Sequence, residues 1–431
     1  MPNVRRGRLA SPWAAAPFYL CYLLPALTLV SVRAHVASHV AGDAAAADAW
    51  AGNTWNTAWF VFAVMPLLEI LVPDDVENPT EEEERDAARD VMYKLPLWLW
   101  PIAQTLCVVC GAWAFVNLPL SLHQAIGLVV STGTCTGGVG IAVAHELLHK
   151  GTRGYEAFAA KYLLALVCYV HFVSSHRFGH HVNVATPRDP SSAPRGMSFY
   201  AFFPRAVVGG YRDAWRIHAS GDARDALGVG FLATAHVAPA GVAVALVFWT
   251  GSLAALAFFV LQAFQAVVLL ELVNYVEHYG LRREWLPEKG TYERVDVRHS
   301  WNAPQRVTNW FVFRLQRHSD HHVRATTPYQ ALRSFPDSPT LPTGYTGTML
   351  CALVPAWFEH SLAPVLDTRD GEKKEAARTE SITAVEKRAG SHGTAPGEGR
   401  WEAANQTAKE RMTIGVLVAT ILVTCLVCWP R

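Results

Sequence analysis

Charged side chains are scarce in this chain. Asp, Glu, Lys and Arg make up 17% of its 431 residues, against about 25% in soluble proteins, whereas 51% of the residues are hydrophobic. The formal net charge is only +1, and no basic stripe interleaves with aromatic residues, which argues against a nucleic-acid-binding surface. The composition therefore indicates an integral membrane protein.

Most of the eight cysteines lie inside apolar runs, so the sequence offers no disulfide framework. Two CxxC pairs occur, Cys107 with Cys110 and Cys425 with Cys428. A zinc ribbon or rubredoxin site needs two such pairs flanked by polar, glycine-rich turns, and neither pair has that setting. We expect the cysteines to be small core residues.

Long apolar runs dominate what remains. Six of them approach the ~20 residues that a helix needs to cross a bilayer. They are 13–32, 55–72, 95–118, 125–144, 227–249 and 253–276, and a seventh candidate is 412–429. The run 155–173 contains Lys161 and His171, which favours an interfacial helix. The pattern predicts an all-α membrane protein with a six-helix transmembrane bundle and a candidate seventh, C-terminal membrane segment.

Two segments are conspicuously polar. Residues 73–90 contain four consecutive glutamates and are expected to form a cytoplasmic loop. Residues 367–411 have almost nothing to bury, which predicts a disordered or loosely helical tether. We therefore divide the chain into a membrane domain at 1–366, with histidine clusters at 145–181 and 278–322, a tether at 367–411 and a C-terminal membrane segment at 412–431.

Basic residues near the ends of the runs indicate the orientation, because Lys and Arg accumulate in cytoplasmic loops. Arg5, Arg6 and Arg8 precede the first run. The connection after the fourth run carries further basic residues: Lys150, Arg153, Lys161, Arg177, Arg188 and Arg195. This count predicts a multi-pass protein whose N-terminus and histidine clusters are cytoplasmic.

Nine of the eighteen histidines are grouped in three clusters and one isolated site beside the apolar runs. They are His145, His149, His176, His180, His181, His278, His318, His321 and His322. Neutral imidazole is a good ligand for transition metals, and the spacing within each cluster can place its rings on one helical face. The clusters therefore predict a site with several metal ligands at a membrane face.

Two simpler interpretations stay open at this point. A single HxxxH pair can be a surface or capping pair, although three clusters together disfavour this. His145-Glu-Leu-Leu-His149 is also an HExxH sequence, the zinc-protease pattern in which Glu146 would be the general base. That interpretation leaves at least six clustered histidines without a purpose.

Four strings in order carry a family resemblance. HELLHK (145–150), HRFGHH (176–181), NYVEHYGL (274–281) and LQRHSDHH (315–322) resemble the membrane alkane hydroxylases, or alkane 1-monooxygenases. These are integral-membrane, non-haem di-iron enzymes related to fatty-acid desaturases and xylene monooxygenase. The resemblance covers roughly residues 55–342, with Ser175 where the family usually has Glu and Leu148 where it commonly has Gly.

The resemblance implies that all nine clustered histidines are ligands of two iron ions. It leaves four nearby carboxylates, Glu146, Asp189, Glu277 and Asp320, as candidates to orient the rings by accepting their distal N–H groups. His171 is a further candidate for this supporting role, and an ordinary core histidine is the alternative.

The resemblance also implies an O2-dependent oxidoreductase that hydroxylates the terminal C–H of medium- to long-chain alkanes to primary alcohols. Two electrons would come from an external rubredoxin-type or ferredoxin-type donor with its reductase. We expect an apolar tunnel whose depth is limited by Trp59 and Phe60. Alternatives are a desaturase or hydroxylase of fatty-acyl, sterol or aromatic-methyl substrates, and a non-catalytic metal-binding membrane protein.

Overall fold

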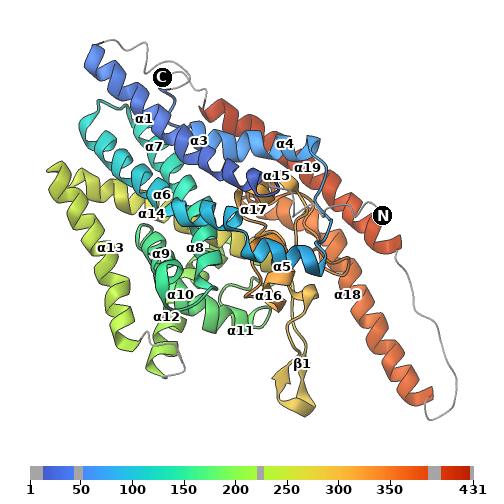
Figure 1. Cartoon of the computed structure of the whole chain (residues 1–431). Coiled ribbons are helices and arrows are strands. Elements are labelled where there is room, and N and C mark those ends of the chain that lie inside the picture. Colours follow the sequence, from blue (N-terminus) through green and yellow to red (C-terminus); the bar gives the residue numbers. More distant parts are fainter. Residues whose placement is uncertain (1–12, 43–51, 221–227, 387–398, 428–431) are drawn as a thin grey trace, which may run out of the picture.

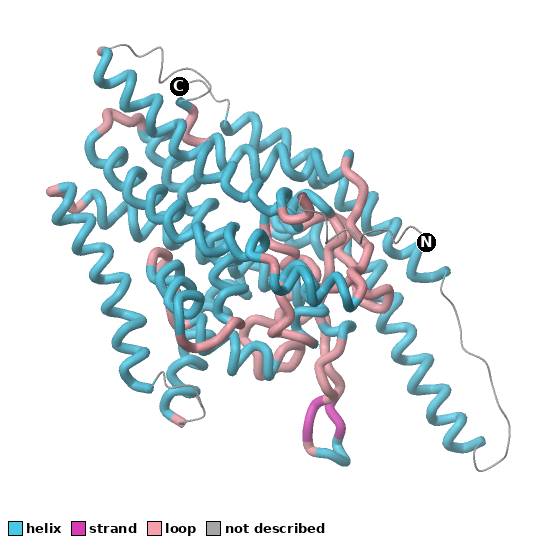
Figure 2. Tube along the Cα trace, in the orientation of Figure 1, coloured by secondary structure: helices cyan, strands magenta, loops and turns pink. Residues whose placement is uncertain are grey.

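The computed structural model is almost entirely helical (Figures 1 and 2). It describes residues 13–42, 52–220, 228–386 and 399–427. The long helices lie side by side in a bundle, and the shorter helices and loops gather at one end of it (Figure 2). This arrangement confirms the predicted fold class.

Five helical segments in the described residues are long and apolar enough to cross a membrane. They are Ala16–Ala41 (η2 Ala16–Tyr22 and α1 Leu23–Ala41), α6 (Val91–Asn117), Leu122–Leu148 (α7 Leu122–Thr134, η5 Cys135–Gly140 and α8 Ile141–Leu148), α14 (Ala254–His278) and Ala403–Val427 within α19 (Gly399–Val427). The C-terminal apolar run is thus one of the five.

Two of the six predicted spans differ from expectation, so the count of six is not confirmed. Residues 227–249 correspond to α13 (Gly228–Thr250), in which the stretch with described side chains is short. Residues 55–72 form α3 (Asn56–Trp59), η4 (Phe60–Val64) and α4 (Met65–Leu71). This helix ends at Val72, which is extended, because the residue before a proline avoids helical geometry.

The polar segment 73–90 is not wholly a loop. It contains α5 (Glu81–Arg89), which begins with a capping box between Thr80 and Glu83. The glutamates that suggested a loop fill the first turn of this helix, where negative charge is favourable near the helix N-terminus. Glu84 then links α5 to the segment that follows α14 through a 2.6 Å ion pair with Arg333.

The polar segment 367–411 is helical where the structure describes it. Its first part continues α18 (Pro355–Glu386), and its last part belongs to α19. Ala404 and Ala408 are buried in line with Met412 and Val416, so small residues spaced four apart give α19 a closely packed face. Composition missed this face because alanine contributes little hydrophobicity. Residues 387–398 lie outside the described part of the chain.

Helix α19 packs along the helix formed by α3, η4 and α4 (Figure 1). The Trp59 indole N–H donates to Thr424 Oγ1 at 3.3 Å, and the Asn53 amide donates to the Val427 carbonyl at 3.5 Å. At Gly415, an added Cβ would lie 2.6 Å from Trp357 Nε1, so this glycine permits the close approach of α18. The C-terminal helix is therefore part of the packed body.

The cap between α14 and α18 is built from short elements. They are β1 (Trp285–Leu286), η7 (Pro287–Lys289), β2 (Thr291–Tyr292), η8 (Val297–His299), α15 (Arg306–Phe311), α16 (His318–Val323), η9 (Tyr329–Ala331) and α17 (Tyr345–Ala352). Strands β1 and β2 pair antiparallel. Trp301, Phe311 and Phe313 are buried in the core.

The remaining helices bring the first two histidine clusters to the cap. They are α9 (Gly154–Ala165), α10 (Phe172–Ser174), η6 (Ser175–His180), α11 (His181–Asn183) and α12 (Phe199–Ala219). Both η5, just before the first cluster, and η6, within the second, are π-helical turns, a wide helical form that is frequent at functional sites. The cysteines in the described residues are free, and Cys21, Cys107, Cys135 and Cys351 are buried as expected of core residues, whereas Cys168 and Cys425 are exposed.

Candidate metal centre

All nine clustered histidines converge at the junction of the bundle and the cap. They form two groups whose nitrogen atoms lie within 4.8 Å of one another in each group. Group one contains His145, His149, His176, His181 and His321, and group two contains His180, His278, His318 and His322. Sequence spacing predicted the convergence of the clusters but not this partition.

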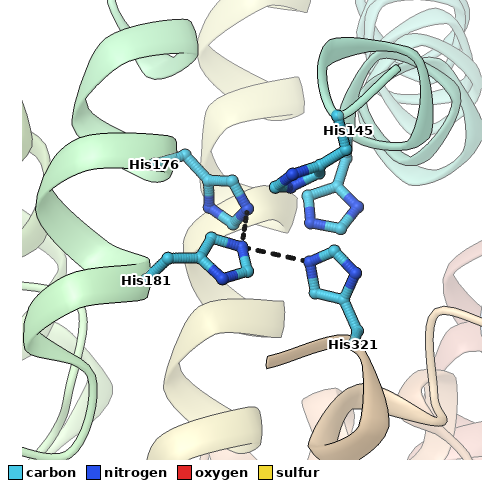
Figure 3. Close-up of side chains that lie close together, drawn as sticks. His145, His176, His181 and His321 are labelled. Atoms are coloured by element: carbon cyan, nitrogen blue, oxygen red, sulfur yellow. Dashed lines mark hydrogen bonds between the residues drawn. The ribbon is translucent and has the colours of Figure 1, made fainter. Parts of the chain in front are cut away.

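Group one draws its rings from three segments that are distant in the sequence. His145 and His149 lie at the end of α8, His176 and His181 on η6 and α11, and His321 on α16. The Nε2 atom of His181 lies 3.0 Å from that of His176 and 3.1 Å from that of His321. Figure 3 shows the rings of His145, His176, His181 and His321 turned toward a common point.

Group two is completely buried. His278 closes α14, His318 and His322 lie four residues apart on α16, and His180 closes η6. The Nε2 atom of His318 lies 3.2 Å from that of His278 and 2.9 Å from that of His322. Neighbouring residues of one cluster thus serve different groups, because His180 and His181 point to opposite sides.

These distances fit ligand sets better than hydrogen bonds. Two nitrogens bound about 2.1 Å from one ion at right angles lie about 3.0 Å apart. A neutral imidazole carries one N–H, so His318 Nε2 cannot donate to both of its close neighbours. Burial lowers the pKa of His176, His318, His321 and His322, and the other histidines add to this effect. The rings are therefore neutral, the form that binds metals.

Asp189 has the supporting position that the sequence suggested. Its Oδ2 atom lies 2.8 Å from His180 Nδ1 and accepts a 2.6 Å hydrogen bond from the Ser192 hydroxyl. This contact fixes the ring and leaves His180 Nε2, which is buried without a hydrogen-bond partner, facing group two.

Glu277 occupies a different position from the one expected. Its Oε2 atom lies 3.2 Å from Nε2 of His318, the nitrogen that faces the other rings, instead of the distal Nδ1. Its Oε1 atom accepts a 2.5 Å hydrogen bond from the Tyr345 hydroxyl. The carboxylate is thus placed beside the ligand atoms of group two.

We expected Glu146 and Asp320 to orient histidine rings, but in the structure both carboxylates bind other groups. Glu146 accepts from Lys150 at 2.7 Å and from the Tyr329 amide at 3.1 Å, which ties α8 to the cap. Asp320 binds Arg324 and the Arg333 amide. Because Glu146 is engaged elsewhere and its two neighbouring histidines join three others, the HExxH protease interpretation is not supported.

His171 also lies outside both groups. Its ring packs against Tyr169 and Tyr211, with centroids 4.2 Å and 5.3 Å away. Sequence reasoning missed Glu271 and Asn274, which are buried on α14 two turns and one turn before His278, respectively. A signal existed, since a carboxylate within an apolar span is a functional candidate and residues 271, 274 and 278 share one helical face.

A cavity of about 30 Å³ is lined by residues of both groups. His145, His176 and His318 line it at one end, and Ile141, Leu270, Val273 and Leu315 are among its apolar walls. Its apolar lining suits a substrate without polar groups.

The tunnel role of Trp59 and Phe60 stays a prediction. Trp59 faces α19, and Phe60 packs on Phe311 with ring centroids 5.7 Å apart. Neither residue lines the cavity beside the histidines.

Sequence comparisons agree with this geometry. Residues 119–347 match the fatty acid desaturase family model, which covers more than half of the chain. Alkane 1-monooxygenase 1 of Pseudomonas aeruginosa is 40% identical over 309 residues, covering 70% of this chain and 80% of that protein. The chain belongs to the alkane 1-monooxygenase family.

Other alkane 1-monooxygenases extend the comparison. Alkane 1-monooxygenase 1 of Alcanivorax borkumensis is 36% identical over 301 residues, covering 69% of this chain and 74% of that protein. The hydroxylase component of a Pseudomonas putida xylene/toluene monooxygenase is 26% identical over 276 residues, covering 62% of this chain and 71% of that protein. Family membership and the apolar helices identify this alkane 1-monooxygenase homologue as an integral-membrane oxidoreductase of the monooxygenase class with a histidine-rich site suited to metal.

Proposed function

We propose that this protein is a di-iron monooxygenase that hydroxylates the terminal carbon of medium- to long-chain alkanes to primary alcohols. The observation that carries the proposal is the meeting of two histidine groups at the end of one apolar cavity. All nine predicted histidines belong to these groups and would hold the two ions. A bound iron pair would supply the activation of dioxygen that an unpolarised C–H bond requires.

The chain's own residues then have the task of positioning the substrate. Ile141, Leu270, Val273 and Leu315 would contact the alkyl carbons next to the reacting one, where burial contributes about 0.8 kcal/mol per methylene. His145 and His318 mark the end of the cavity where the reacting carbon would lie. Asp189 keeps His180 in the orientation that directs its Nε2 atom inward.

Electrons would enter on the side of group one. His149 and His181 are only half-buried. Burial lowers the pKa of His149, and His145, His181, Arg177 and Lys150 lower it further. Lys150 pairs with Glu146 at 2.7 Å, so the basic rim beside these rings depends mainly on Arg177. A basic rim attracts acidic proteins. We therefore infer an acidic rubredoxin-type or ferredoxin-type donor, supported by its reductase, that docks at a cytoplasmic face.

Metal analysis of the purified chain tests the proposal. We expect close to two irons per polypeptide, with Mössbauer spectra of an iron-57 sample that indicate nitrogen ligands. His318→Ala and His321→Ala should each lower the iron content, whereas His39→Ala, on an exposed position of α1, should not. One zinc per chain, or iron unaffected by either substitution, would contradict a di-iron site.

Product analysis tests the reaction. With a supplied donor, reductase and O2, we expect an alkane to yield its primary alcohol, identified by gas chromatography. Alkene or hydroxylated fatty-acyl products without alkane turnover would favour the desaturase or lipid-hydroxylase alternative. Iron binding without oxygen-dependent product would favour a non-catalytic metal protein.

A further inference from the structure

A polar chamber adjoins the metal centre within the wall formed by η6, α12 and α14. Its volume of about 10 Å³ has room for about one water molecule. The titratable groups that line it are Tyr169, His176, His180, Asp189, Asp213 and Glu271. Ser175 and Asn274 add further polar groups. Only His176 and His180 among these residues belong to the proposed ligand set.

Glu271 is a carboxyl group of the chamber. Its hydrogen-bond partners are not histidines of either group. It lies in the membrane-spanning helix α14 and is 2% exposed. The Tyr169 hydroxyl donates to its Oε1 atom at 2.8 Å, and the Asn274 amide donates to its Oε2 atom at 3.1 Å. Two neutral donors thus fix the orientation of the carboxyl group without an ion pair at these atoms.

Asp213 forms the outer end of the chamber. Its side chain is 10% exposed and pairs with Arg216, whose side chain is 73% exposed. A Cβ added at Gly179 would lie 3.5 Å from Asp213 Oδ2, so the carboxylate of α12 approaches η6 closely at this glycine. Burial raises the pKa of Asp213, Arg216 opposes this and Asp189 adds to it. Asp213 is therefore a carboxyl group between the chamber and the protein surface.

Asn274 forms the inner boundary. It lines both the polar chamber and the apolar cavity beside the histidines, as do His176 and Phe172. The amide that holds Glu271 is therefore part of the wall that separates this carboxyl group from the cavity. A carboxyl group can transfer a proton to a reacting group directly or through one water.

Monooxygenation needs such a route. One dioxygen molecule, two electrons and two protons convert a C–H bond into C–OH and one water. Glu277 lines the cavity, but its Oε2 atom lies 3.2 Å from Nε2 of the proposed ligand His318. The apolar walls have no protons to give, and histidines that hold metal ions are not free to shuttle them. The two protons must cross from the surface to a buried site in every turnover.

We propose that Asp213, one water in the chamber and Glu271 form the proton route to the metal centre, with Tyr169 and Asn274 as positioning residues for Glu271. Glu271 gives its proton toward the reduced oxygen in the cavity and receives another from the water, which Asp213 resupplies from the surface. Each carboxyl group regains its starting state, so the two protons consumed come from bulk water. This inference rests on the proposed function.

The first test does not depend on turnover. In the full-length protein transferred to D2O, we expect an infrared carboxyl band that shifts on deuteration and is lost in Glu271→Gln. Asp213→Asn should retain the band but slow its shift. The matched control is Glu69→Gln, which replaces a similarly buried carboxyl group outside the chamber and should leave the band unchanged. A band that survives in Glu271→Gln, or that shifts at an unaltered rate in Asp213→Asn, overturns the route.

The second test measures the reaction. With iron content and Mössbauer spectrum unchanged, Glu271→Gln should slow alcohol formation by roughly 10²-fold, as expected for loss of a general acid, and should enlarge the solvent isotope effect. Glu271→Asp should restore part of the rate. A wild-type rate and isotope effect in Glu271→Gln, or loss of iron from this variant, contradicts a proton-transfer role. Absence of alcohol from the wild-type enzyme would instead contradict the proposed function.

Discussion

The two histidine groups are built from the same clusters but differ in their surroundings. Group one has five rings, of which His149 and His181 are half-buried, with Arg177 and Lys150 nearby. Group two has four fully buried rings, and carboxylates contact two of them, Asp189 at His180 and Glu277 at His318. The difference suggests that electrons arrive at the more open group one, whereas the substrate cavity and the polar chamber adjoin rings of both groups.

Loss of a group-two ligand should have the largest effect. His322→Ala removes a fully buried ring whose Nε2 atom lies 2.9 Å from that of His318. We expect iron to fall from two to about one per chain, and activity to fall by more than the roughly 10–100-fold typical of losing an outer partner. Metal analysis and Mössbauer spectroscopy check this. His218→Ala, on α12, replaces a buried histidine that belongs to neither group and serves as the control. Retention of both irons would show that the partition into five and four is wrong.

Asp189→Asn should have the second largest effect and should separate the iron affinities of the two groups. The substitution keeps the size of the side chain but weakens the 2.8 Å contact with His180. We expect the iron affinity of group two to fall about 10–100-fold while group one is retained. Titration of apoprotein with ferrous iron measures the two affinities, and exposed Asp86→Asn on α5 is the control. An equal loss at both groups would show that Asp189 supports the whole site.

Metal removal should distinguish the groups kinetically. Because two ring edges of group one are half-buried and group two is sealed, a hydrophilic chelator should extract the iron of group one several-fold faster. Time-resolved metal analysis during incubation with the chelator should therefore show two phases. A single phase would indicate that both ions leave through one common opening of the structure.

The basic rim should give the smallest effect. Arg177→Glu reverses a charge near group one, so donor association should slow several-fold at low salt and the difference should shrink as ionic strength rises. Stopped-flow reduction by a rubredoxin-type donor measures this rate. Arg294→Glu, on an exposed position of the β1–β2 region, controls for net charge. Equal slowing by both variants would argue against docking at group one.

The sequence predicted the parts of the site that depend on residue type and local spacing. It identified the nine histidines and the apolar helices that carry them. It could not assign neighbouring His180 and His181 to different groups, because that depends on how η6 meets α14 and α16. For the same reason it placed Glu277 on the distal nitrogen of a ring, whereas its oxygen lies 3.2 Å from the inward nitrogen of His318.

The fold was predicted least well where packing outweighs composition. Residues 404 and 408 are alanines in a polar stretch, yet they are buried because α17 and α18 come close enough to cover a small side chain. Likewise, the run of glutamates from Glu81 suggested a loop, but the Thr80 side chain caps the first turn of a helix there. Neither close approach nor capping geometry is visible in average polarity.

The π-helical turn η5 has a consequence for how this site tolerates insertion and deletion. A π turn holds one residue more than an α turn, and one residue corresponds to about 100° of rotation around the axis. η5 directly precedes α8, so it sets the rotational phase of His145 and His149 relative to the rest of Leu122–Leu148. Because the wide turn takes up one extra residue, deleting Gly138, where an added Cβ would meet nothing, should restore a regular helix and keep the phase of both rings. Converting the turn to a regular helix without a deletion should instead rotate both rings by about 100° away from the centre. The wide turn of this helix is thus as much a requirement of the metal site as its histidines are.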